Sequence, residues 1–284
     1  SILIRSTTIT KIRFYAIKTN KPKRLLLFLN FMKYLKIPFL LIWRLWFYIL
    51  MTITVILMSP LLFIFTFKEA YYHLLWKLVR IWAKLLIYGM GFRLNIQLDQ
   101  EIEPNKSYMF CPNHASLMDP FVLIALSKNP IVFVGKQELV KIPIFGFFYK
   151  RAVIMVDRGN PKSRKRVYER AKKRLQNGVS MAIFPEGLVP TEDVILAPFK
   201  KGAFNLAIEF DMPIVPQVYF DCKRFFSWDF LKGGPGVFRV RQHQFIATKG
   251  LSPDQMENLK ETTFDIIYND LINDAKYMKD TQRN

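Results

Sequence analysis

Residues 108–120 read Tyr-Met-Phe-Cys-Pro-Asn-His-Ala-Ser-Leu-Met-Asp-Pro, an apolar run that changes into a polar segment. A short apolar run bounded by turn-forming residues is typical of a buried β-strand. It predicts a strand over 107–111, then a loop, then a helix over 120–127 that begins at Pro120. A polar loop that directly follows a buried strand is where α/β proteins usually hold their ligands.

The loop contains His114 and, five positions later, Asp119, in a chain that has only three histidines. On a regular helix the two side chains would point about 140° apart, so they meet only if the segment is a loop. There a carboxylate can orient an imidazole that acts as a general base. The structural alternative for Asp119 is that it serves only as the N-cap of the following helix. A metal pair is a further alternative, but the sequence offers no third ligand with suitable spacing.

The rest of the chain alternates between short apolar runs and longer amphipathic stretches, which predicts an α/β domain. No internal repeat or low-complexity tract interrupts this pattern. The predicted strands are 92–98, 107–111, 131–135, 152–156, 179–184, 213–219 and 237–247. The predicted helices are 120–127, 161–176, 201–210 and 253–278.

Polar side chains gather where four of these strands end. Because ligands bind beyond the carboxyl ends of strands in open α/β sheets, we expect these residues to share one edge. They are Asn113 and His114, Lys136, Asp157 and Arg158, and Glu186.

Four sequence blocks resemble, in order and spacing, those of the glycerolipid acyltransferases, and in particular the bacterial-type lysophosphatidate O-acyltransferases. They are Asn113-His114 through Asp119, Val153–Arg158, Phe184–Gly187 and Ile214–Pro216. The resemblance covers roughly 35–250. It implies a mixed β-sheet flanked by helices over 92–284, preceded by a two-helix membrane-binding segment over 32–91.

The resemblance also implies roles for residues. His114 would take the proton from a lysophospholipid hydroxyl, and Asp119 would hold the imidazole tautomer. The acyl group would come from a thioester of acyl carrier protein or coenzyme A, without metal or cofactor. Arg158 and the turn Glu186-Gly187 match family positions that hold glycerol phosphate. We add Asn113 and Lys136 as substrate-binding candidates, with a solvated lysine as the alternative for Lys136.

One departure from the family pattern concerns the acceptor. The family usually has Thr-Arg after Phe-Pro-Glu-Gly, whereas this chain has Leu188-Val189. No apolar residue replaces the bidentate contact of arginine with phosphate. Either Lys200 or Lys201 takes over this contact, or the acceptor is another lysolipid such as lyso-ornithine lipid. A catalytically silent membrane scaffold on the same fold is the remaining alternative.

The charge of the chain suggests an anionic partner. It carries 42 basic and 22 acidic residues, a formal net charge of +20. Both nucleic acid and an anionic membrane fit such a balance. Residues 1–100 hold 15 Lys and Arg against 2 Asp and Glu, around the most apolar part of the chain. This placement favours lipid over nucleic acid. The basic stretch 161–176 is either a solvated helix face or a docking site for acyl carrier protein.

The membrane-binding segment is predicted as two helices. Residues 45–67 contain no charge, enough for a helix of about 35 Å, and Pro60 should kink or divide it. The second helix, 71–90, carries a basic stripe made of His73, Lys77, Arg80 and Lys84. Because basic residues flank 45–67 on both sides, we expect a bent pair that dips into the cytoplasmic leaflet of the inner membrane. A single span is the alternative.

Two smaller expectations concern the N-terminus and the cysteines. Residues 1–31 lack clear periodicity, and Met32 opens a plausible start, so this stretch is expected to be an extension or disordered. It does not resemble a cleavable signal peptide. Cys111 and Cys222 are expected to be small core residues in a reducing compartment.

Overall fold

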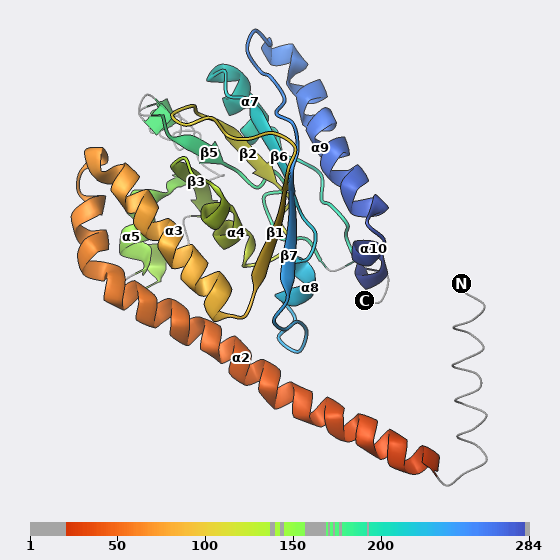
Figure 1. The fold of residues 1–284 in the computed structure, drawn as a ribbon. Helices are drawn as coiled ribbons and strands as arrows, with labels where there is room; N and C mark the ends of the chain where they lie inside the picture. Colours follow the sequence, from red (N-terminus) through yellow and green to blue (C-terminus); the bar gives the residue numbers. More distant parts are fainter. Residues whose placement is uncertain are drawn as a thin grey trace.

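The computed structural model describes residues 21–136, 140–142, 145–156, 178–191 and 193–281, and the single positions 169, 171, 172, 174 and 175. Of residues 21–35, Glu69, Lys136, Val156 and 279–281 it describes the backbone alone. Strands within these ranges form one seven-stranded sheet in the order β1-β7-β6-β2-β5-β3-β4 (Figure 1). They are β1 (Arg93–Leu98), β2 (Met109–Pro112), β3 (Ile131–Lys136), β4 (Ile154–Val156), β5 (Ser180–Ala182), β6 (Ile214–Tyr219) and β7 (Val237–Gln242).

The sheet is mixed, as predicted. Strands β6, β2, β5, β3 and β4 run parallel to one another, whereas β7 pairs antiparallel with β6 and parallel with β1. The carboxyl ends of β2, β5 and β6 therefore lie at the same edge. Parallel strands must be joined by crossovers, which brings helices onto both faces of the sheet.

Alternation along β2 shows how the two faces are covered. Phe110 packs with buried residues of α2, α3 and α4, whereas Met109 and Cys111 pack with α7 and α9 on the other face. This follows from the period of two in a strand. The helices of the domain are α4 (Asp119–Leu126), α5 (Phe145–Ala152), α7 (Gly202–Glu209), α8 (Cys222–Phe225), α9 (Met256–Asn273) and α10 (Ala275–Thr281). Both Cys111 and Cys222 are free and buried, as predicted.

The structure corrects several predicted elements. The long helix expected over 253–278 is a short 3-10 turn, η3 (Pro253–Gln255), then α9 and α10, which are separated at Asp274. Strand β7 stops at Gln242, five residues before its predicted end. Helices α5 and α8 were not predicted. The predicted helix 161–176 lies mostly outside the described residues.

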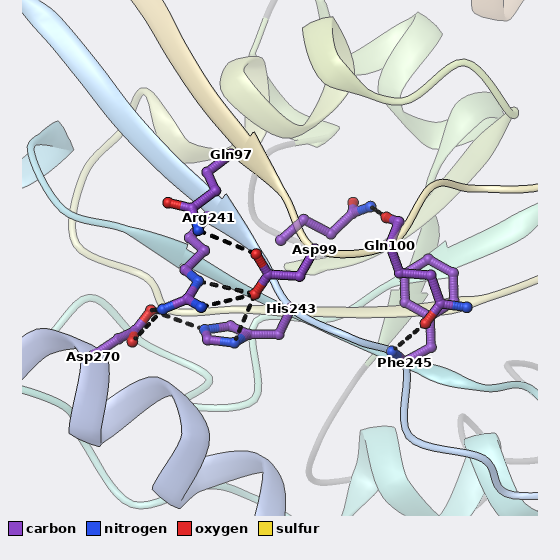
Figure 2. A network of polar contacts seen from close by, with 8 residues as sticks. Gln97, Asp99, Gln100, Arg241, His243, Phe245 and Asp270 are labelled. Carbon is purple, nitrogen blue, oxygen red and sulfur yellow. Dashed lines mark hydrogen bonds and ion pairs between the residues drawn. The ribbon is translucent and has the colours of Figure 1, made fainter.

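A polar network ties the edge of the sheet to α9 (Figure 2). Arg241 of β7 binds Asp99 through Nε at 3.0 Å and Asp270 of α9 through Nη1 at 3.0 Å. His243 lies 2.9 Å from Asp270 through Nε2. Because charge-assisted hydrogen bonds fix geometry well, this network holds the helix against β1 and β7.

The N-terminal part contains two helices, α2 (Lys21–Thr66) and α3 (Tyr72–Gly89), with η1 (Glu69–Tyr71) between them. Helix α2 continues through Pro60, so this proline does not divide it. Figure 1 shows α2 bending near its C-terminal end, as expected where proline removes a helix hydrogen bond. The helix begins at Lys21, so the boundary predicted at Met32 falls inside it. Residues 1–20 lie outside the described residues.

The two helices pack closely on each other and on the domain. Trp43 and Trp46 of α2 donate their indole N–H groups to the carbonyls of Met90 and Gly89, at 3.1 and 3.0 Å. A side chain at Gly89 would collide with Leu50. On α3 the predicted stripe His73, Lys77 and Lys84 is exposed and Arg80 is half-buried.

The outer face of α2 is apolar and exposed. Lys36–Thr66 is long and apolar enough to cross a membrane by length and composition, and its most apolar 18-residue window has a mean hydropathy of 2.3 with only 6% of its residues buried. Such a face is unusual for a protein surrounded by water. Its most exposed members are Ile42, Leu45, Leu57, Phe39 and Ile64.

Candidate active site

His114 and Asp119 form a hydrogen-bonded pair at the carboxyl end of β2. Nδ1 of His114 lies 2.9 Å from Oδ2 of Asp119. Residues 114–118 are not helical. The two side chains were predicted to meet only if this segment is a loop. The imidazole keeps 20% of its side-chain surface exposed, whereas the carboxylate is fully buried.

Asp119 is held by the loop that precedes it. Its Oδ2 also accepts the backbone N–H groups of Ala115 at 2.6 Å and Ser116 at 2.7 Å. Helix α4 starts at Asp119 with Met118 as N-cap, so Asp119 does not have the N-cap role given as its structural alternative. Its carboxylate accepts hydrogen bonds from the preceding loop rather than from the first turn of the helix. These bonds hold the loop in the tight conformation that exposes His114.

The His114 ring also stacks on Phe184, with ring centroids 4.2 Å apart and planes 25° apart. Phe184 follows β5, the strand next to β2. One side of the imidazole is thus covered by an aromatic ring while Nδ1 is held by Asp119. Two independent contacts fix the orientation of the ring.

Glu186 anchors the backbone of the histidine. Its Oε1 accepts the N–H of His114 at 2.6 Å and its Oε2 accepts the N–H of Ala197 at 2.8 Å. Burial raises the pKa of Glu186 to about 7, and the two N–H groups oppose that rise. The side chain is 2% exposed, so Glu186 connects the histidine loop to the segment 187–199 inside the protein.

Asn113 has a different position from the one expected of a substrate contact. Its Nδ2 donates to the carbonyl of Tyr219 at 3.2 Å, and its Oδ1 accepts the N–H of Tyr219 at 2.7 Å. The residue is 2% exposed. Its amide therefore joins the ends of β2 and β6, and a contact with substrate stays a prediction.

The other predicted substrate-binding residues divide into three groups. Gly187 forms the turn after Glu186, with φ of 71° and its N–H donated to the carbonyl of Phe184 at 3.0 Å. Lys200 is exposed and joins the same turn, because its N–H donates to the carbonyl of Pro185 at 2.8 Å. Lys201 instead pairs with Glu257 of α9, Nζ to Oε2 at 3.4 Å. Arg158 and the side chain of Lys136 lie outside the described residues.

Tyr277 of α10 is a positioning residue that sequence reasoning missed. Its hydroxyl donates to the carbonyl of Ile195 at 2.9 Å, two residues before Ala197. Asp274 accepts the N–H of Tyr277 at 2.7 Å and also binds Arg239 of β7. A series of contacts therefore runs from the sheet through α10 to Glu186 and His114. Nothing local in the sequence indicates it.

Comparison with known proteins identifies the family of this site. The family described as Acyltransferase matches residues 93–220. The chain is 30% identical over 209 residues to the 1-acyl-sn-glycerol-3-phosphate acyltransferase of Limnanthes alba, a match that covers 70% of each protein. The chain belongs to the acyltransferase family.

Other members are similar over shorter parts. The 1-acyl-sn-glycerol-3-phosphate acyltransferase of Cocos nucifera is 28% identical over 181 residues, which is 63% of this chain and 58% of that protein. The human 1-acyl-sn-glycerol-3-phosphate acyltransferase alpha is 28% identical over 187 residues, 65% and 66% of the two proteins. The chain spans about half the length of several curated relatives that it matches.

The fold of this family member is also found in a solved structure. The crystal structure of the 1-acyl-sn-glycerophosphate acyltransferase PlsC from Thermotoga maritima superimposes with a TM-score of 0.68 at 19% identity, and covers 84% of this chain and 95% of that one. The mixed sheet with flanking helices is therefore the acyltransferase fold. The family match contains His114, Asp119 and Glu186 but ends before Arg239, Asp274 and Tyr277.

Proposed function

We propose that this chain is a membrane-attached O-acyltransferase that moves an acyl group from a thioester to the free hydroxyl of lysophosphatidate, giving phosphatidate. The observation that carries the proposal is the hydrogen bond of 2.9 Å between Nδ1 of His114 and Asp119 on an imidazole that remains partly exposed. The names of the relatives agree with this acceptor.

His114 acts as the general base. A carboxylate only accepts hydrogen bonds, so Nδ1 carries the proton of this pair and Nε2 has the free lone pair. Nε2 takes the proton of the lysophosphatidate hydroxyl, whose oxygen attacks the thioester carbonyl. The imidazolium then returns the proton to the departing thiol. Asp119 stabilises the imidazolium, and help of this kind contributes about 10²–10⁴ in rate.

Glu186, Phe184 and Asn113 keep that base in place. Glu186 holds the backbone of His114, Phe184 covers its ring, and Asn113 joins the two strand ends beneath it. None of these contacts uses Nε2. The three residues are therefore assigned to positioning rather than to proton transfer.

The acceptor headgroup is assigned to the turn after β5. The side chains of Leu188 and Val189 offer neither a hydrogen bond nor a charge to phosphate, so a cation from elsewhere must supply this contact. Lys200 is the better candidate than Lys201, because its backbone is bonded to the same turn while Lys201 is paired with Glu257. Arg158 and Lys136 remain candidates from the sequence. The alternative acceptor is a lyso-aminolipid such as lyso-ornithine lipid, which is favoured by the presence of Leu188-Val189 where the family usually has Thr-Arg.

The membrane position follows from the packing of α2. Arg44 bonds to the domain near one end of the exposed stretch, and Phe63 stacks on Phe147 of α5 near the other, with ring centroids 5.9 Å apart. These two residues are about 29 Å apart along a helix. If α2 crossed a bilayer, these parts of the domain would be drawn into hydrocarbon. We therefore favour a helix that lies in the interface, on the cytoplasmic face of the inner membrane, over a single span.

The donor is a thioester of acyl carrier protein or coenzyme A, with no cofactor. The partners are membrane lipids, the lysolipid and, where it supplies the donor, acyl carrier protein. Nucleic acid is not a partner.

The test supplies the purified full chain with a labelled acyl thioester and a panel of lysolipids. Phosphatidate formed from lysophosphatidate supports the proposal. Consumption of a lyso-aminolipid alone would replace the acceptor, and no product with any lysolipid would favour the silent scaffold.

A further inference from the structure

The connection between α8 and β7 carries a second exposed apolar patch. We define residues 227–233 as the Trp228 loop. Trp228 is 55% exposed, Phe230 46% and Leu231 51%. Figure 1 shows this connection reaching the flank of α2. Three large apolar side chains together on a loop are unusual on a surface that meets only water.

The loop is fixed to α2 by one buried cation. Nη2 of Arg44 lies 2.7 Å from the carbonyl oxygen of Ser227, 3.2 Å from that of Asp229 and 2.8 Å from that of Lys232. The guanidinium also lies over the ring of Phe226 at 4.1 Å and near that of Phe230 at 5.5 Å. Arg44 therefore sets the position of the loop relative to the exposed face of α2.

The backbone of the loop is hydrogen-bonded inside the protein. The N–H of Asp229 donates to Oγ of Ser227 and that of Leu231 donates to Oδ1 of Asp229, both at 2.9 Å. The N–H of Lys232 donates to the carbonyl of Asp229 at 3.1 Å. Irregular backbone enters a lipid environment only when its polar groups are satisfied, and this loop meets that condition to a large extent.

The patch continues the apolar face of α2. On a helix, Leu41 and Tyr48 lie three and four positions from Arg44, so they border the side on which the loop sits. Both are exposed. Tryptophan next to aliphatic and basic side chains is typical of the layer between lipid headgroups and hydrocarbon. Lys232, at the end of the loop, pairs with Asp229 of the same loop, Nζ to Oδ2 at 3.9 Å, so the loop contributes apolar contact rather than net charge.

We propose that the Trp228 loop is a second lipid-contacting element, inserted into the headgroup layer of an anionic bilayer beside α2. It would fix the rotation of the domain about the α2 axis, which a single helix in the interface does not. This inference rests on the proposed membrane attachment of the chain.

The test uses single cysteine labels on the full chain. Both native cysteines are fully buried, so an introduced surface cysteine is the reactive one. Leu231→Cys reports on the loop and Leu57→Cys, at a leucine 73% exposed, reports on α2. Leu98→Cys is the matched control, because Leu98 is 49% exposed on the edge strand β1. Each variant carries an environment-sensitive fluorophore and is mixed with vesicles of phosphatidylcholine and phosphatidylglycerol, with and without brominated acyl chains.

The expected result is a shift of emission to shorter wavelength, and quenching by brominated lipid, for labels at 231 and 57 but not at 98. A response at 57 without one at 231 would overturn the loop proposal and leave membrane attachment standing. No response at either position would overturn both. A shift at 231 that requires added unlabelled protein rather than lipid would assign the patch to a second copy of the chain, against the proposal.

Discussion

The hydroxyl of Tyr277 lies 2.9 Å from the backbone carbonyl of Ile195, although the two residues are 82 positions apart. Two residues beyond Ile195, the N–H of Ala197 holds one oxygen of Glu186, and the other oxygen holds the backbone of His114. Helix α10 thus takes part in placing a loop that lies far from it in the sequence. Tyr277 itself is 4% exposed.

Tyr277→Phe removes this hydroxyl and leaves the ring. The carbonyl of Ile195 loses its partner, which costs about 1–3 kcal/mol when the group stays buried. We expect a lower Tm and a kcat reduced about fivefold, with KM for the thioester unchanged. The matched control is Tyr268→Phe on α9, whose ring stacks on Phe264 and whose hydroxyl has no hydrogen bond among the described residues. Equal effects of the two substitutions would contradict a positioning role for Tyr277.

His114→Ala removes the proposed base while the loop keeps its backbone contacts with Glu186. We expect loss of acyl transfer by at least about 10² in kcat, because general-base help is worth about 10²–10⁴. Binding to phospholipid vesicles should be unchanged, because α2 and α3 are not altered. His73→Ala, at an exposed position of α3, is the control for loss of any histidine. Activity close to that of the wild type in His114→Ala would remove the mechanism.

Glu186 predicts a specific dependence of stability on pH. Burial raises its pKa from 4.5 to about 7 in the folded protein. Below pH 4.5 the group is protonated in both states. Between pH 4.5 and about 7 the unfolded chain releases this proton while the folded chain keeps it, so stability falls as pH rises. Above about pH 7 this dependence ends.

The drop due to Glu186 is on the order of 3 kcal/mol. In thermal unfolding, the Tm of the wild type should fall as pH rises across this range. The Tm of Glu186→Gln should not show this fall, because glutamine does not titrate. The substitution also loses one of the two backbone hydrogen bonds, so its Tm is expected to be lower at acid pH. Parallel profiles of the two proteins would show that Glu186 is not the group responsible.

The sequence predicted the histidine pair because its chemistry is local. His114 and Asp119 are five residues apart, and the strand before them and Pro120 after them limit where the loop can lie. The sheet was predicted for the same reason, since apolar runs bounded by turns mark its strands. Helix α5 was missed because a short aromatic run does not distinguish a strand from a helix by periodicity.

Long-range contacts could not be predicted. The amide of Asn113 is bonded to Tyr219 on another strand, 106 positions away, and the sequence did not indicate this contact. The predicted helix 253–278 breaks at Asp274, whose carboxylate binds Arg239 and the N–H of Tyr277. Sequence spacing contains no information on which strand will lie next to which loop, so these roles appear only in three dimensions.

The two adjacent lysines allow a test of how the acceptor phosphate is held. Lys200 is exposed beside the turn that carries Glu186, whereas Lys201 is paired with Glu257 of α9. Lys200→Ala is expected to raise KM for lysophosphatidate about tenfold, since a charge-assisted hydrogen bond is worth about 1.5–3 kcal/mol. Lys201→Ala should change KM by less than about twofold, because its Nζ lies at Glu257 of α9. The measurement is initial rate against lysophosphatidate in mixed micelles at saturating thioester. A different result is that both substitutions leave KM unchanged while a lyso-aminolipid is a better acceptor. In that case the chain lacks the family's arginine because its acceptor has a different headgroup, and no lysine replaces the arginine–phosphate contact.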